Sequence, residues 1–69
     1  MKRISIQSGE LVSVGYDAEL HVLEVELRYY GVYQFVEVSA EVYAALISAP
    51  NQYEYFKASI DTKFLCRKI

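Results

Sequence analysis

The chain has 69 residues, a formal net charge of −2 and an apolar fraction of 54%, so it forms at most one domain, residues 1–69, near the size limit for a single hydrophobic core. The apolar fraction and the scarcity of Pro and Gly exclude a disordered chain. The negative charge argues against a protein that simply coats nucleic acid or anionic lipid.

The single cysteine and the N-terminal segment limit the protein's compartment and cofactors. Cys66 is the one cysteine, which excludes an internal disulfide and a multi-cysteine zinc site. The first five residues, Met-Lys-Arg-Ile-Ser, carry positive charge without the apolar run of a signal peptide, and no stretch approaches a membrane span. We therefore expect a cytoplasmic protein with no cofactor and no membrane association.

The first part of the chain has the alternation of short strands separated by turns. A first strand or extended lead-in surrounds Ile4, and Ser8-Gly9-Glu10 is a turn signal. A second strand is predicted over Leu11–Tyr16, in which Gly15 indicates a bulge or a close backbone approach. Asp17-Ala18-Glu19 then forms the next turn, because an aspartate can bond to the backbone two residues on.

The strongest strand signal lies over Val22–Tyr29. Apolar residues occupy one face there and Glu24, Glu26 and Arg28 the other, which is typical of an antiparallel sheet with one wet side. Tyr30-Gly31 closes a hairpin, and Val32–Val38 is predicted to return beside the strand.

The remaining segments predict two short helices and an extended tail. Ser39 is a good N-cap for a helix through Ala49, which Pro50-Asn51 ends. A second helix fits Gln52–Ser59, with Tyr53, Phe56 and Ile60 on one stripe, and Phe64–Ile69 is an extended tail or short strand. The predicted fold class is α+β: a three- to four-stranded antiparallel meander followed by two short helices packed on one sheet face.

Two hairpin registers are possible, and they place Tyr33 and Phe35 on opposite faces. A three-residue loop Tyr29-Tyr30-Gly31 pairs Leu27 with Tyr33, so both aromatic residues enter the core. A two-residue loop Tyr30-Gly31 turns them outward beside Arg28. We favour the first register because it spares Tyr30 a positive φ, which is costly for a large side chain.

Catalysis has little support in these residues. Asp17, Glu19 and His21 lie close together in a turn, without a second histidine or a glycine-rich phosphate loop elsewhere. Cys66 is far from His21 in sequence and is interpreted as an incidental thiol, although Arg67 and Lys68 beside it could lower its pKa. We expect a protein that is not an enzyme and holds no metal.

Nucleic-acid binding has the necessary residue types. A sheet face with aromatic residues beside an arginine can stack unpaired bases while lysines contact phosphates. The candidate residues are Arg28, Tyr29, Tyr30, Tyr33, Phe35, Lys57, Lys63, Arg67 and Lys68. The alternative is a protein-interaction or homodimer module, for which outward-facing Val22, Val32 and Val36 would form an apolar patch.

The ordered set Val14-Gly15-Tyr16-Asp17, Leu23-Glu24-Val25-Glu26-Leu27 and Gly31-Val32-Tyr33-Gln34-Phe35 resembles the KTSC domain family, named for the C-terminal domain of some lysyl-tRNA synthetases. The likeness runs from about Ile6 through Val42-Tyr43 and Tyr55-Phe56 to Ile69. The family's central Tyr-x-Tyr motif would here be Tyr33-Gln34-Phe35.

The resemblance implies a stand-alone bacterial or phage domain of unestablished function for which RNA binding has been suggested. The nucleic acid we expect as a partner is RNA, either tRNA-like or single-stranded. Some positions depart from the family pattern. Tyr29 and Tyr30 replace small residues in the turn, Ser39 replaces a common proline, and Asp61 stands where basic residues or glycine are frequent. The added aspartate weakens the expectation of RNA binding.

Overall fold

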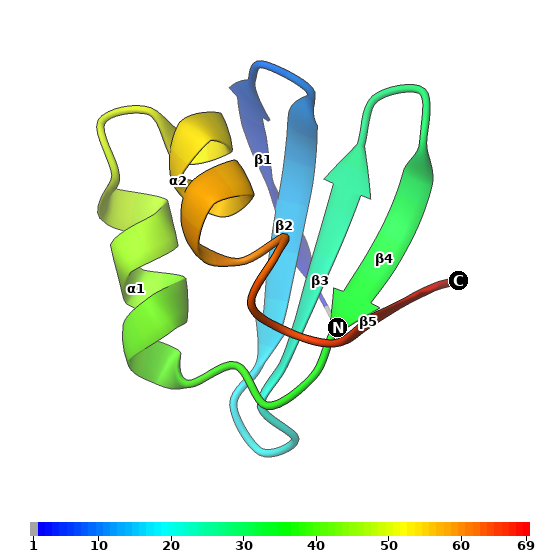
Figure 1. The fold of residues 1–69 in the computed structure, drawn as a ribbon, viewed down its shortest axis with the longest axis vertical. Coiled ribbons are helices and arrows are strands. Elements are labelled where there is room, and N and C mark those ends of the chain that lie inside the picture. The colour runs from blue at the N-terminus through cyan, green and yellow to red at the C-terminus, as the bar shows by residue number, and fades with distance from the viewer. Residues whose placement is uncertain (1) are drawn as a thin grey trace.

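The computed structural model describes residues 2–69, which form a five-stranded antiparallel sheet with two helices on one side (Figure 1). Neighbours in the sheet follow chain order: β1 (Arg3–Ser8), β2 (Leu11–Asp17), β3 (Val22–Leu27), β4 (Gly31–Phe35) and β5 (Cys66–Lys68). Helices α1 (Ala40–Ser48) and α2 (Gln52–Ser59) connect β4 to β5. The predicted α+β class is confirmed, with five strands because both the lead-in and the tail pair with the sheet.

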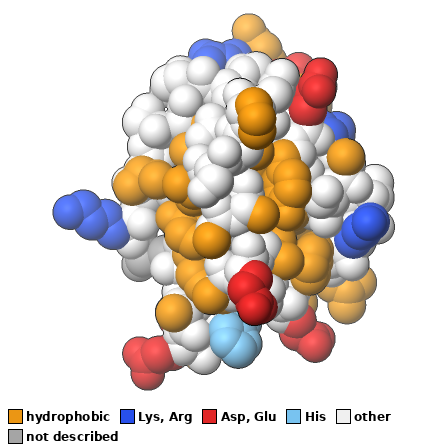
Figure 2. All heavy atoms as spheres, turned by 90° about the vertical axis from the view of Figure 1, so that its left-hand side faces the viewer, with side chains coloured by type: hydrophobic (Ala, Val, Ile, Leu, Met, Phe, Trp, Pro, Cys, Tyr) orange, Lys and Arg blue, Asp and Glu red, His pale blue; other side chains and the backbone are white. Residues whose placement is uncertain are grey.

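The hydrophobic core lies between the sheet and the helices. Phe35 of β4 and Phe56 of α2 meet edge to face at its centre, with ring centroids 5.5 Å apart. A second aromatic contact joins β2 to α1, where the rings of Tyr16 and Tyr43 stack at 4.8 Å. The fully buried side chains are Leu11, Val14, Leu23, Val25, Phe35, Val38, Leu46, Phe56 and Ile60. On the α1 side of the molecule, hydrophobic side chains gather in the middle and lysines and arginines lie at the margins (Figure 2).

Both helices begin at side chains that satisfy free backbone N–H groups. Ser39 Oγ accepts from the Val42 N–H at 3.3 Å, as predicted for the first helix. Asn51 Oδ1 accepts from the Glu54 N–H at 3.1 Å, so the residue that helps to end α1 also caps α2. The second helix spans the predicted residues.

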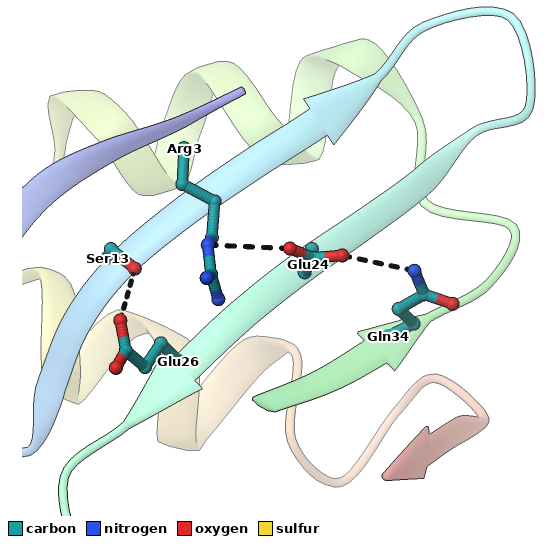
Figure 3. A network of polar contacts seen from close by, with 5 residues as sticks. All are labelled: Arg3, Ser13, Glu24, Glu26 and Gln34. Carbon is teal, nitrogen blue, oxygen red and sulfur yellow. Dashed lines mark hydrogen bonds and ion pairs between the residues drawn. The ribbon is translucent and has the colours of Figure 1, made fainter. Parts of the chain in front are cut away.

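The outer face of the sheet carries a polar row across all five strands. Arg3, Gly15, Glu24, Gln34 and Arg67 are consecutive cross-strand partners. Because Gly15 has no side chain, Arg3 Nε reaches over β2 to Glu24 Oε2 at 3.4 Å, and Gln34 Nε2 donates to the other Glu24 oxygen at 3.1 Å (Figure 3). Gly15 was predicted to mark a bulge or a close backbone approach; the bulge of β2 against β3 lies instead between Leu11 and Ser13, which lets Leu11 and Val14 both face the core.

The β3–β4 hairpin confirms the predicted faces and corrects the predicted pairing. Tyr33 pairs with Val25 and Phe35 with Leu23, so the loop is Arg28-Tyr29-Tyr30 and the register is displaced by two residues. An even displacement keeps the faces, and both aromatic side chains point toward the helices. Gly31 has the expected positive φ of 96°, but Tyr29 has one as well, 75°. This turn ends β3 at Leu27 rather than Tyr29.

We expect Tyr29→Gly to stabilise the domain. Tyr29 is 86% exposed, so its side chain contributes little packing, and a left-handed φ costs an L-residue about 1–2 kcal/mol. The chain entropy of glycine offsets about 0.5–1 kcal/mol of that gain. Urea unfolding should therefore show a net gain of about 0.5–1 kcal/mol. Tyr30→Gly, at a residue without positive φ, is the control, and it should lower stability; equal effects of the two changes would contradict the strain at Tyr29.

Candidate functional site

A groove of about 460 Å³ opens on the helix side of the sheet, between the β3–β4 hairpin, β5 and α2. Its walls are aromatic and apolar, with three charged side chains among them. We call it the tyrosine groove; it is lined by Glu10, Leu27, Tyr30, Tyr33, Phe35, Tyr53, Lys57, Asp61 and Cys66. Since most of these side chains project from the sheet or from α2, the groove depends on the packing of that helix over β4.

Three tyrosines contribute accessible ring surface to the groove. Tyr33 extends from β4 beside the buried Phe35, and Tyr30 is 53% exposed at the end of the hairpin turn. The turn places Tyr30 by a hydrogen bond from its backbone N–H to the Leu27 carbonyl at 3.2 Å. Tyr53 comes from the first turn of α2, on the other wall.

Tyr53 is held by the turn between β1 and β2. Its backbone N–H donates to Ser8 Oγ at 3.2 Å, and its hydroxyl donates to Glu10 Oε1 at 3.2 Å. Gly9 lies under the ring, and a Cβ on Gly9 would come within 2.8 Å of Tyr53 Cδ2. The sequence predicted that Tyr53 lies on the inner stripe of α2, but it did not identify Tyr53 as a residue of this site. Gly9 was recognised as part of a turn, but the contact between this turn and α2 could not be seen in the sequence.

The charged residues of the groove are two carboxylates and one ammonium. Lys57 Nζ pairs with Asp61 Oδ2 at 2.8 Å, and this hydrogen bond is the main cause that raises the pKa of Lys57. Desolvation, followed by the hydrogen bond and charge of Glu10, raises the pKa of Tyr53. The tyrosine is therefore neutral at physiological pH. Of the three charged groups in the groove, Glu10 is the one that forms no ion pair with any of the described residues 2–69.

The structure brings four of the predicted nucleic-acid-binding residues to this region. Tyr30, Tyr33 and Lys57 line the groove. Lys68 is the cross-strand partner of Tyr33, and its Cε lies 3.1 Å from the position that a Cβ on Gly31 would occupy. Lys68 therefore lies on the same sheet face as Tyr33, beside the hairpin.

Of the other five predicted residues, Phe35 borders the groove from the core and the remaining four lie elsewhere. Phe35 is 1% exposed and belongs to the core, so the prediction that it stacks on bases is wrong. Tyr29 is exposed in the hairpin turn and does not line the groove, and Arg28 donates to Gln7 Oε1 at 3.3 Å. Lys63 borders a smaller hollow beside Phe64. Arg67 lies on the outer face, where it donates twice to Gln34 Oε1.

The acidic turn that precedes β3 is used for structure. Asp17 Oδ1 accepts from the backbone N–H groups of Glu19 and Leu20 at 3.0 and 3.1 Å. His21 lies in the same turn with a φ of 56°. Within residues 2–69 no three His, Cys, Asp or Glu side chains are grouped so that they could hold a metal ion. None of the helices there is long and apolar enough to cross a membrane.

Comparison with known proteins gives a family match over most of the chain. The KTSC domain model matches residues 7–64. A protein of Stutzerimonas stutzeri strain A1501, described as uncharacterized, is 41% identical over 56 residues, which cover 81% of this chain and 79% of that protein. The crystal structure of a KTSC domain protein from Yersinia pestis has a TM-score of 0.95 at 35% identity and covers 99% of this chain and 96% of its own.

We expect Gly9→Ala to destabilise the domain and to displace Tyr53 from the groove. The new methyl group would overlap the Tyr53 ring, and Gly9 has a left-handed φ of 55° that costs other residues about 1–2 kcal/mol. Loss of more than about 2 kcal/mol is expected in urea unfolding. In a Tyr53→Ala background the same change should cost only the backbone strain. Strictly additive effects in this double-mutant cycle would contradict the contact.

Proposed function

The chain belongs to the KTSC domain family, and from the geometry of its tyrosine groove we propose that it is a small non-enzymatic module that binds single-stranded RNA. The observation that carries the proposal is the convergence of Tyr30, Tyr33 and Tyr53 on one groove that has Lys57 at its side. Aromatic side chains that reach an open surface beside lysines are the usual means of holding unpaired bases.

The bases are held by stacking on the tyrosine rings. The groove has a volume of about 460 Å³, and two of its walls, β4 and α2, contribute aromatic side chains to its lining. Stacking of one base on an aromatic side chain contributes about 1–3 kcal/mol, as measured by alanine substitution. Two or three such contacts give useful affinity without a strongly basic surface.

The phosphates remain outside the groove. Glu10 and Asp61 would repel a phosphate that entered, whereas Lys57 at the groove and Lys68 beside the hairpin would attract one at the opening. The strand is thus oriented with bases inward and backbone outward. Because only two lysines take part, the electrostatic contribution is small, which agrees with the net charge of −2.

A second candidate function, self-association, is supported by the outer face of the sheet. Val22 and Val32 lie on the predicted outer face, and all three valines of the predicted patch are half-buried. The polar row separates Val22, Val36 and Leu65 from Val32 and Ile69, and Leu65 and Ile69 are 79% and 60% exposed. A second copy that covers Val22, Val36 and Leu65 would leave the tyrosine groove free, so the two functions are compatible.

We expect Tyr30→Ala to weaken RNA binding by about tenfold, because it removes one stacking contact. The measurement is fluorescence anisotropy of a labelled single-stranded oligoribonucleotide of mixed sequence. Tyr29→Ala is the matched control, since Tyr29 is the neighbouring exposed tyrosine but does not line the groove. Equal losses in the two variants, or no binding by the unmodified protein, would refute the proposal.

The same titrations repeated at several salt concentrations test the role of the lysines. With two phosphate contacts to single-stranded RNA, log K should fall against log salt with a slope of about −1.4. Lys68→Gln should reduce the slope by about 0.7, while Lys63→Gln, away from the groove, should leave it unchanged.

Self-association is tested by sedimentation equilibrium of the unmodified protein and of Leu65→Lys. Leu65 is exposed, so a charge there costs the monomer little stability but opposes burial in an interface. We expect a dimer that dissociates at least tenfold more readily in the variant. A monomer at all concentrations, or a dimer that Leu65→Lys does not change, would exclude this interface.

A further inference from the structure

We infer that the tyrosine groove selects guanine over the other three bases and that Glu10 recognises its Watson–Crick edge. The inference rests on the proposed function, because it specifies which base of a bound single strand enters the groove. It is carried by the carboxylate of Glu10, which lines the groove together with Tyr33 and Tyr53.

Glu10 has hydrogen-bonding capacity left over. Its Oε1 accepts from the Tyr53 hydroxyl at 3.2 Å, and within residues 2–69 no other hydrogen bond to this carboxylate is present. An ionised carboxylate has about four acceptor positions, so most of those on Glu10, which lines the groove, are unused by the described residues. The bond to Tyr53 also restricts the orientation of the carboxylate, which favours the recognition of one particular edge.

Lys57 supplies a donor near these acceptors. Its ammonium pairs with Asp61 at 2.8 Å, and Lys57 and Glu10 line the same groove. An ammonium has three donors, so Lys57 can bond to Asp61 and still donate to a ligand. The polar part of the groove therefore offers acceptors from Glu10 beside a donor from Lys57.

Guanine is the base whose edge matches this pattern. Its N1–H and N2–H are adjacent donors that can both bond to one carboxylate, and its O6 lies next to them as an acceptor for an ammonium. Adenine and cytosine place a ring nitrogen acceptor beside their amino group, and uracil flanks its single N–H with two carbonyl oxygens. Each of these three would set lone pairs against the carboxylate, which is unfavourable in a partly desolvated site.

The test compares four labelled oligoribonucleotides of nine nucleotides, all uridine except for a central G, A, C or U. The measurement is fluorescence anisotropy with the full chain. We expect the oligonucleotide with G to bind about tenfold more tightly than the other three, as for one good bidentate contact to a base. The Tyr53 hydrogen bond can be preserved in the variant Glu10→Gln, whose fold is checked by its urea unfolding midpoint.

Glu10→Gln separates base recognition from simple electrostatics. Removal of a negative charge that repels phosphate should tighten binding of the all-uridine strand, while the advantage of G falls below about twofold. Glu54→Gln is the matched control: it removes the same charge from an exposed residue of α2 outside the groove and should keep the full preference.

The possible failures can be told apart. If none of the four strands binds, the proposed RNA function itself is refuted, and this inference with it. If all four bind equally, or A, C or U is preferred, the function stands and guanine selection is refuted. A preference for G that survives Glu10→Gln would refute the role of Glu10.

Discussion

The edge-to-face contact between Phe35 and Phe56 is the interaction on which the rest of this domain depends. It joins β4 to α2, two elements that are separated in the chain by α1, and both rings are fully buried. This contact fixes the position of α2 over the sheet. As a result Tyr53, in the first turn of α2, lines the tyrosine groove together with Tyr33 and does not cover it. The groove is thus a consequence of core packing: the second aromatic residue of the Tyr33-Gln34-Phe35 segment fixes the helix, and the first remains available at the rim.

The faces of the hairpin strands could be predicted from the sequence, but their pairing could not. Alternation left two registers open, and the cost of a positive φ at Tyr30 favoured the one that turns Tyr33 and Phe35 toward the helices. The turn type decides between pairings that differ by two residues, and it depends on which residue takes a left-handed φ. Sterics favoured Gly31 alone, yet Tyr29 takes one too, because the Leu27–Tyr30 turn and the bond from the Arg28 N–H to the Glu10 carbonyl outweigh the strain. The bulge, which was one of two alternatives at Gly15, lies between Leu11 and Ser13 for a similar reason: burial of Leu11 beside Val14 decided its position, and no local pattern signals that.

The candidate site was predictable only in part, since it combines residues distant in the chain. Tyr30, Tyr33 and Lys57 were chosen by residue type and do lie together. Tyr53 was missed because its position depends on Ser8 and Gly9, some 45 residues earlier. The basic C-terminal segment was treated as one cluster, whereas β5 alternates: Arg67 bonds to Gln34 on the outer face and Lys68 lies with Tyr33 on the inner face. When a tail is predicted only as extended, its partner strand is unknown. The sequence then does not show which of its charged residues lie on which face of the sheet.

The division between faces explains why one short segment can serve both structure and binding. Gln34 closes the polar row of the outer face between Glu24 and Arg67, while its neighbours Tyr33 and Phe35 face inward. Phe35 packs in the core and Gln34 bonds to Glu24 and Arg67 in the polar row. Substitution of either residue would therefore destabilise the sheet, whatever its effect on a ligand. Tyr33 alone combines a half-buried ring with access to the groove. Within this segment, Tyr33 is therefore the residue whose substitution can change ligand binding without disturbing the sheet. Outside the segment, Glu10 and Tyr53, which line the same groove, can do the same.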